Sequence, residues 1–282
     1  MEDAAAGVAR SSGSYSLGHS QAELDRLSAQ AHLIEPITRR FFVDAGIGPG
    51  MRVLDVGSGA GDLALLAREL VGPEGGVVGT DRGSTALVVA RERARSMTNV
   101  TFLDGDPSEM TFPEPFDAVV GRYVLMHQPD PVAVVRKLLA HLRPGGIVVF
   151  HEPYRAGIRS FPPLAAYDRG WELVDETFRR SGADPLMGIK LHATFVAAGL
   201  PPPSMRMESV IAGGAASSDV VHFEMDVVGT LVPEMERLGV ATANEAAADT
   251  LADRVLAEAA ASESVVVGRS EVGAWSRLLA DF

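Results

Sequence analysis

Residues 55–62 read Asp55-Val56-Gly57-Ser58-Gly59-Ala60-Gly61-Asp62, and this segment decides how the rest of the chain is interpreted. It follows a short apolar run over 53–56 and precedes a helical pattern over 63–70, so it joins a buried strand to a helix. Glycines permit a tight turn and let a ligand lie against main-chain atoms. The helix that begins there adds free N–H groups. The segment therefore predicts a ligand-binding turn at the carboxyl end of a strand.

The spacing of the glycines narrows the choice of ligand. A dinucleotide-binding turn has the pattern Gly-x-Gly-x-x-Gly, with a pyrophosphate on the helix end. Counted from Gly57, the third glycine of that pattern falls on Asp62. The carboxylates of Asp62 and Asp55 would repel a pyrophosphate, whereas they suit a ligand with a positive charge. A nicotinamide-dependent (NAD(P)) oxidoreductase is therefore disfavoured and stays only as an alternative.

Strand-like and helical segments alternate regularly on both sides of this turn. Such alternation predicts an α/β fold with a doubly wound, seven-stranded and mostly parallel sheet, covered by helices on both faces. The later strands are expected at 77–80, 100–103, 116–120, 147–150, 205–210 and 265–268. Further helices are expected at 86–95, 132–142, 171–179, 189–198, 219–238 and 244–261. The stretch between the last two strands is longer than a sheet connection requires, so we expect it to form a helical cover.

Composition excludes several classes of function. The chain has 282 residues, with 25 Lys+Arg against 37 Asp+Glu, and its formal net charge of -12 disfavours nucleic acids and anionic membranes as partners. It has no cysteine, which excludes disulfides and thiolate metal sites. His192 and His222 lack the spacing of metal ligands, so no metal site is expected. With no apolar run of ~20 residues and no signal-like N-terminus, we expect no membrane insertion and a cytoplasmic location.

The glycine segment resembles the cofactor motif of the class I S-adenosylmethionine-dependent methyltransferases. Further landmarks of that family occur in order at later strand ends: Asp81, Gly105-Asp106, Gly121-Arg122 and Arg143-Pro144-Gly145-Gly146. Together they cover roughly residues 35–155. The resemblance implies a Rossmann-like methyltransferase fold, S-adenosyl-L-methionine as cofactor and S-adenosyl-L-homocysteine as product.

Two less specific similarities indicate one branch of the family. Segments 15–19 and 267–275 are similar to small-molecule methyltransferases related to those of quinone biosynthesis. The resemblance divides the chain into four parts. These are a flexible N-terminus (1–14), an N-terminal helical cover (15–45), a cofactor-binding core (46–155), and closing strands with helical lid insertions (156–282).

The resemblance also implies roles for individual residues. Asp81 would accept both ribose hydroxyls, Asp106 would face the adenine amino group, and Arg122 would lie at the methionine end. The sequence departs from the family at Pro107, which has no N–H for the adenine ring, and at Arg82, whose guanidinium could stack on that ring. The expected cofactor-binding residues are Tyr15, Asp55, Gly57, Ser58, Gly59, Gly61, Asp81, Arg82, Asp106, Pro107, Gly121 and Arg122.

Candidate catalytic residues are fewer. His151 and Glu152 follow the fifth strand, where ligands bind in this fold, and strand alternation directs only one of them into the site. Either could accept a proton from the methyl acceptor, as could His19 in the N-terminal segment.

The predicted function is methyl transfer to a small, fairly apolar acceptor. We expect a secondary metabolite or a quinone- or phenol-like compound, methylated at oxygen or carbon. A protein that binds the cofactor without catalysis is the non-enzymatic alternative. The expected partners are the small-molecule acceptor and, as an open alternative, a second copy of the chain.

Overall fold

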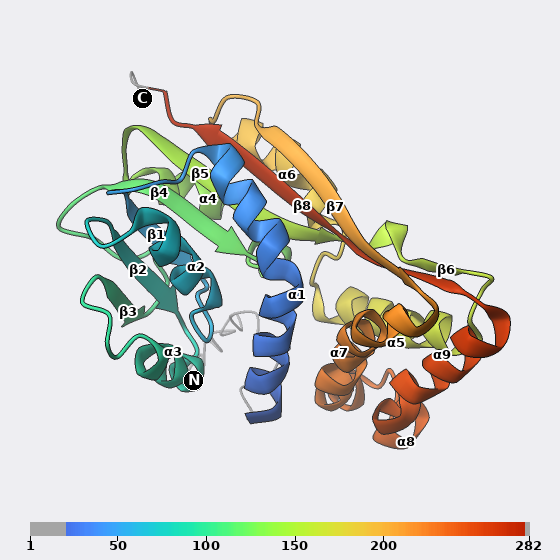
Figure 1. The fold of residues 1–282 in the computed structure, drawn as a ribbon. Helices are drawn as coiled ribbons and strands as arrows, with labels where there is room; N and C mark the ends of the chain where they lie inside the picture. Colours follow the sequence, from blue (N-terminus) through green and yellow to red (C-terminus); the bar gives the residue numbers. More distant parts are fainter. Residues whose placement is uncertain (1–20, 280–282) are drawn as a thin grey trace, which may run out of the picture.

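A computed structural model describes residues 21–279 of the chain, with side chains from Leu33 onward except that of Ala215 (Figure 1). The helices are α1 (Gln21–Ala45), α2 (Asp62–Val71), α3 (Ser84–Arg93), α4 (Pro131–Leu139), α5 (Ala165–Ser181), α6 (Met187–Ala198), α7 (Ser217–Leu238), α8 (Ala243–Ala246) and α9 (Ala248–Ser262). Short 3-10 turns are η1 (Leu125–His127), η2 (Arg155–Gly157) and η3 (Gly214–Ala216). The strands are β1 (Arg52–Val56), β2 (Gly76–Asp81), β3 (Val100–Asp104), β4 (Phe116–Arg122), β5 (Leu142–Tyr154), β6 (Arg159–Phe161), β7 (Ser204–Gly213) and β8 (Val265–Arg277).

These strands form one twisted sheet in the order β3-β2-β1-β4-β5-β8-β6. Strands β5 and β6 pair with successive parts of one edge of β8, and β7 pairs with the opposite edge of β8. Strands β1 to β5 are parallel, and β8 runs antiparallel to β5, β6 and β7. Within residues 52–277, β8 is therefore the one reversed strand. The predicted fold class, a Rossmann-like and mostly parallel sheet, is confirmed. The eighth strand, β6, was not expected because three residues are too short to show a periodicity.

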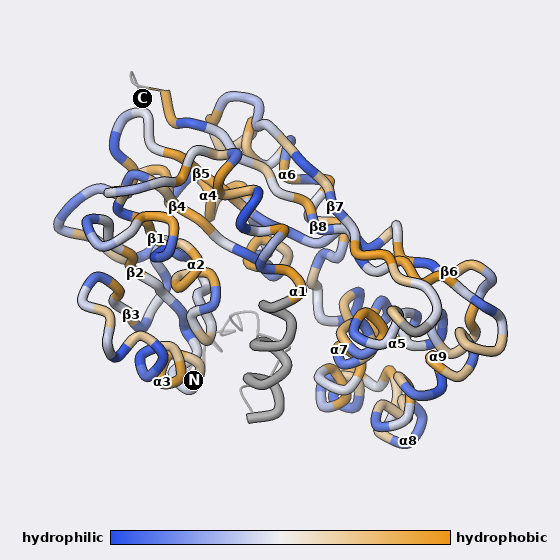
Figure 2. The backbone as a smooth tube through the Cα atoms, in the orientation of Figure 1, coloured by the Kyte–Doolittle hydropathy of each residue, from blue (hydrophilic) through white to orange (hydrophobic). Residues whose placement is uncertain are grey.

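Helices cover both faces of the sheet because the side chains of each buried strand alternate between two cores. Val53 packs with the α2 and α3 side chains, whereas its neighbour Leu54 packs with those of α4 and α6. On β5, Val149 likewise belongs to the core on the α2–α3 side and its neighbour Phe150 to the core on the α4–α6 side. Figure 2 shows the central strands as hydrophobic along much of their length, as expected for strands buried on two faces.

Strand β8 is much longer than the apolar run predicts. The expected strand ends at Gly268, whereas β8 continues to Arg277. Its polar residues Arg269, Ser270 and Glu271 interrupt the apolar pattern, yet all three are buried. A buried strand with charged side chains requires partners for those charges elsewhere in the fold.

The predicted helical cover lies between the last two strands. Helices α7, α8 and α9 connect β7 to β8 and lie with α5 at the end of the long β7–β8 pair, away from β1–β3 (Figure 1). Helix α1 crosses β5 and β8, and Gly273 permits its approach, since a Cβ there would lie 2.5 Å from the Phe41 ring. In the described part of the chain, no helix is long and apolar enough to cross a membrane. The four-part division of the chain stays a prediction.

Candidate active site

The glycine segment forms the turn that the sequence predicts. Gly57, Gly59 and Gly61 have φ values of 67°, 52° and 90°, which side chains rarely adopt. A Cβ at Gly61 would also lie 2.9 Å from Phe102 Cζ, so the turn packs directly on β3. At Gly59 nothing lies within 4 Å of the position that a Cβ would take. The turn thus packs tightly against the sheet at Gly61 and is open beside Gly59.

A cavity of about 420 Å³ opens in front of this turn, at the carboxyl ends of β1, β2, β3 and β4. Most of the predicted cofactor residues line it, namely Gly57, Ser58, Gly59, Asp81, Arg82, Asp106, Pro107 and Arg122. Val124, His127 and Ala183 also contribute to the wall. Asp55, Gly61 and Gly121 are not part of the lining, and Tyr15 and His19 lie outside the described residues. The structure therefore gathers residues from four strand ends around one space.

Asp55 is fully buried on β1 directly beside this cavity. Neither of its carboxylate oxygens has a hydrogen-bond partner among the groups that the structure describes. Burial raises the pKa of Asp55 well above its ordinary value, and the nearby Arg122 charge offsets this only in part. Since an unpaired buried carboxylate is costly, the site is suited to a cationic ligand.

Asp81 ends β2 and is held by the turn. Its Oδ2 accepts the Gly59 N–H at 2.8 Å, and its Oδ1 accepts the Gly83 N–H at 2.7 Å. Each carboxylate oxygen can accept more than one hydrogen bond, so both retain capacity for a ligand. The two N–H groups fix the direction in which that capacity points.

Arg82 forms an ion pair with Asp106 across the rim of the cavity. The sequence predicts separate roles for them, with Arg82 on the adenine ring and Asp106 at its amino group. Asp106 also accepts the Ser108 N–H at 2.8 Å. Burial alone would raise the pKa of Asp106, but Ser108 and the Arg82 charge outweigh it and lower that pKa. The Ser108 N–H is thus already used within the loop that follows β3.

Glu152 binds the turn that follows β4. Its carboxylate accepts the N–H groups of Val124, Leu125 and Met126 at 2.9, 2.7 and 3.3 Å. It is fully buried and does not line the cavity. Burial raises the pKa of Glu152 to about 8, although the three N–H groups act in the opposite direction. Through these three hydrogen bonds, the Glu152 carboxylate fixes the position of η1.

His151 points to the opposite side of β5, as strand alternation requires. Its Nδ1 lies 3.1 Å from Thr38 Oγ1 on α1, and its Nε2 lies 2.8 Å from Glu271 Oε2 on β8. The ring also makes an edge contact with Phe41, with centroids 5.0 Å apart. Burial lowers the pKa of His151, although Glu271 counteracts it. His151 is therefore a buried link between α1 and β8.

Glu271 collects three hydrogen bonds, two of them from residues that the sequence did not suggest. Tyr123 Oη donates to Oε2 at 2.7 Å, and Arg269 Nε donates to Oε1 at 3.0 Å, in addition to His151. Arg269 in turn lies 3.9 Å from Glu224 on α7. We call Tyr123, His151, Glu224, Arg269 and Glu271 the buried polar network. The one available signal was the pair of charges at Arg269 and Glu271, which alternation places on one face of a buried strand.

The network reaches the cofactor cavity at Arg122, the last residue of β4, and at Tyr123, which follows it. Arg122 and Tyr123 both line the cavity, and Arg122 Nη1 donates to Thr38 Oγ1 at 3.3 Å. Tyr123 has a φ of 57°, a conformation uncommon for a bulky residue. Such strain persists only where surrounding contacts enforce it, and it often marks a functional site.

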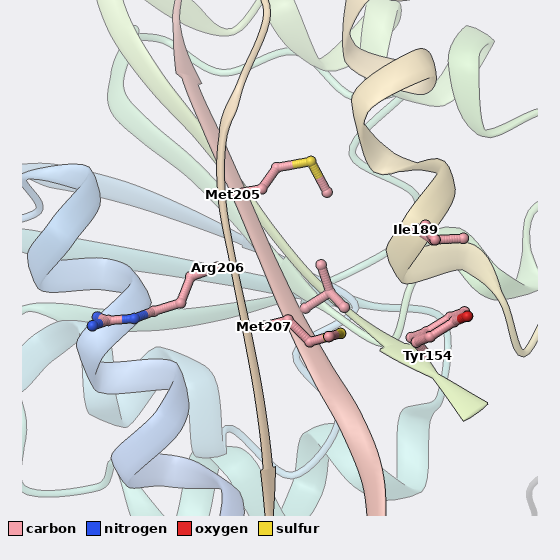
Figure 3. A pocket seen from close by; sticks show the side chains of 6 residues that line it. Tyr154, Ile189, Met205, Arg206 and Met207 are labelled. Atoms are coloured by element: carbon pink, nitrogen blue, oxygen red, sulfur yellow. The ribbon is translucent and has the colours of Figure 1, made fainter. Parts of the chain in front are cut away.

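A second, smaller cavity of about 200 Å³ lies on the outer side of the β7–β8 pair (Figure 3). Met205 and Met207 face it together with Ile189 and Tyr154, while Arg206 points the other way, toward α1. Within residues 204–277, β7 pairs only with β8. None of the predicted site residues that the structure describes lies here, and self-association of the chain stays a prediction. Nor do the described side chains include a group of three His, Asp or Glu that could hold a metal ion.

Comparison with known proteins agrees with this geometry. A family profile described as a methyltransferase domain matches residues 47–179. Over 120 residues the chain is 41% identical to 2-phytyl-1,4-naphtoquinone methyltransferase of Synechococcus elongatus, covering 40% of this chain and 52% of that protein. Over 129 residues it is 33% identical to demethylmenaquinone methyltransferase of Staphylococcus aureus, covering 45% of this chain and 54% of that protein. The chain thus spans about half the length of these relatives.

The fold is also found in solved structures. A candidate methyltransferase from Bacillus halodurans aligns with 85% of this chain and 97% of its own, with a TM-score of 0.56 and 18% identity. That similarity concerns the fold alone, while the resemblance to methyltransferases rests on the profile match and on the identity to the two quinone methyltransferases. Residues 47–179 thus match a methyltransferase domain, and the chain resembles the class I S-adenosylmethionine-dependent methyltransferases, among them the two quinone methyltransferases.

Proposed function

We propose that this protein transfers a methyl group from S-adenosyl-L-methionine to a small, fairly apolar acceptor of the quinone or phenol type. The observation that carries the proposal is Asp55, a buried carboxylate with no partner among the described groups, beside the cavity formed by the glycine turn. A cationic ligand would supply the missing partner. The names of the two quinone methyltransferases support the acceptor class.

The residues around the cavity fit the cofactor's separate chemical groups. Asp55 would compensate its positive charge, and the spare oxygen lone pairs of Asp81 would accept the ribose hydroxyls. The open surface at Gly59 leaves room for the ligand against the main chain. Asp106 would face the adenine end, with Arg82 paired to it rather than stacked on the ring. When bound, the sulfonium cofactor supplies both the methyl group and its own leaving group.

Methyl transfer requires that the acceptor be aligned with the methyl group and that a base take up the proton that the acceptor loses. We infer that Glu152 contributes by holding the turn at 124–126, because its carboxylate is occupied by three N–H groups. We infer that His151 contributes by orienting Glu271. His19 stays a candidate for direct contact with the acceptor. Transfer to oxygen or to carbon of an aromatic acceptor is compatible with this arrangement.

The test of this proposal is binding of S-adenosyl-L-homocysteine, measured by titration calorimetry. Asp81→Ala removes the acceptor of two expected hydrogen bonds, so we expect affinity to fall by about 2–3 kcal/mol, which is roughly 30- to 150-fold. Asp104→Ala is the matched control, since Asp104 ends the neighbouring strand but is exposed and does not line the cavity. Unchanged affinity in Asp81→Ala would remove Asp81 from the cofactor site.

A further inference from the structure

Tyr123 connects the cofactor cavity to the buried polar network. Tyr123 is one of the residues that line the cavity, and its hydroxyl donates to Glu271 Oε2 at 2.7 Å. The ring lies near two guanidinium groups, with Arg122 and Arg269 at 5.8 and 5.5 Å from its centroid. Together with the strained φ of 57°, these contacts hold the hydroxyl in one orientation.

The direction of the Tyr123 hydrogen bond follows from the charge of Glu271. The carboxylate receives Arg269 Nε at 3.0 Å and His151 Nε2 at 2.8 Å as well as Tyr123. Burial would raise the pKa of Glu271, but Arg269 and the other donors outweigh it and lower that pKa to about 2. The carboxylate is therefore ionised at neutral pH and can only accept. The single proton of the Tyr123 hydroxyl is committed to it.

A hydroxyl whose proton is committed offers only its oxygen lone pairs to another partner. We propose that Tyr123 selects and orients methyl acceptors that carry a hydroxyl, by accepting the hydrogen bond of that hydroxyl, and that Glu271 positions Tyr123 for this task. The inference rests on the proposed function, because it concerns the acceptor of the same reaction. It adds one requirement to the proposed function, namely a hydrogen-bond donor on the acceptor beside Tyr123.

The same pair provides an outlet for the proton released by transfer to an acceptor oxygen. The acceptor's oxygen forms the bond to the methyl carbon, and the electron pair of the broken carbon–sulfur bond stays on sulfur. The acceptor's O–H bond breaks, its proton passes to Tyr123 Oη, and the proton of Tyr123 passes to Glu271 Oε2. A methylated hydroxyl is a strong acid while it keeps its proton, so a weakly basic carboxylate suffices as the final acceptor.

The experiment compares two probes, 1-naphthol and 1-methoxynaphthalene, in which a methyl group replaces the donor hydrogen, bound to the protein saturated with S-adenosyl-L-homocysteine. For the parent protein we expect 1-naphthol to bind about tenfold more tightly, the effect of one hydrogen bond. Tyr123→Phe should abolish this preference. Glu271→Gln should reduce it, because the freed Tyr123 hydroxyl can then donate its proton. Tyr167→Phe is the matched control, since Tyr167 is buried in the cover and its hydroxyl donates to the Val267 carbonyl.

Calorimetry of S-adenosyl-L-homocysteine binding and thermal melting separate this inference from other failures. Tyr123→Phe should keep cofactor affinity within about twofold of the parent while it loses the probe preference. Equal binding of the two probes by the parent, or a preference that survives in Tyr123→Phe, overturns the inference. If Glu271→Gln does not fold, the Tyr123→Phe result alone decides. Failure of the parent to bind S-adenosyl-L-homocysteine would instead overturn the proposed function.

Discussion

Asp55 in the cofactor half of the sheet and Glu271 in the β5–β8 half are both fully buried carboxylates, but they differ in their hydrogen-bond partners. Glu271 has three donors, and Arg269 compensates its charge. Asp55 has no hydrogen-bond partner among the described groups. Glu152, between them in the sheet, is an intermediate case, because it has three N–H donors and no ion pair.

The difference separates a carboxylate that is fully hydrogen-bonded without a ligand, Glu271, from one that is not, Asp55. A buried charge is tolerated when it is paired and hydrogen-bonded, and it is costly otherwise. The buried polar network can therefore hold α1, α7, β5 and β8 together before any ligand binds. The cofactor cavity, in contrast, keeps one uncompensated charge that a cationic ligand would neutralise. Removing the compensation of each carboxylate in turn tests this comparison.

The largest effect is expected at Arg269, whose charge compensates Glu271. Arg269→Met should remove the charge that balances Glu271 and Glu224 and leave two buried carboxylates without their arginine, at a cost of about 3–5 kcal/mol in unfolding free energy. Urea denaturation at pH 7 measures this loss. Arg237→Met is the control for removal of an arginine, since Arg237 is exposed and forms an i,i+3 pair with Glu234. A loss in Arg269→Met no larger than that of the control would show that the network does not stabilise the fold.

A second effect, spread over several pH units and smaller at any single step of pH, is expected at Glu152. Its pKa is raised from 4.5 to about 8 in the folded protein. Between these values the unfolded chain releases a proton that the folded chain keeps, so the unfolding free energy falls as the pH rises, by up to about 1.4 kcal/mol per pH unit. This contribution is complete below pH 4.5 and lost above about pH 8.

The measurement for Glu152 is the slope of unfolding free energy against pH, not its absolute value. Glu152→Gln should flatten the slope between pH 5 and 8 relative to the parent, because the amide does not titrate. Glu92→Gln, at an exposed glutamate on α3, should leave the slope unchanged. Equal slopes in parent and Glu152→Gln would mean that Glu152 titrates at its ordinary pH in the folded protein.

The same comparison explains how much the sequence could reveal. The cofactor turn is local: Asp55, Gly57 and Gly61 lie within seven positions, and strand periodicity places Asp81 on the same edge. The fold class and this cavity were therefore predictable. Glu271 meets Tyr123 and His151 across 148 and 120 positions, and its partners depend on the register of β8 with β5. No pattern within either segment encodes that pairing, so the network became visible only in the structure.

The smallest effect, and the one with the opposite sign, is expected at Asp55. Asp55→Asn removes an uncompensated buried charge, so without ligand the variant should be more stable than the parent, by about 1 kcal/mol at pH 8. The gain should vanish below pH 3.8, the ordinary pKa of aspartate, where the parent carboxyl is protonated in both states. Saturating S-adenosyl-L-methionine should reverse the order, because its positive charge favours binding to the folded parent over binding to the variant. Thermal melting with and without ligand measures both signs. A variant less stable than the ligand-free parent at pH 8 would mean that Asp55 already has a partner within the chain, and the contrast with Glu271 would be lost.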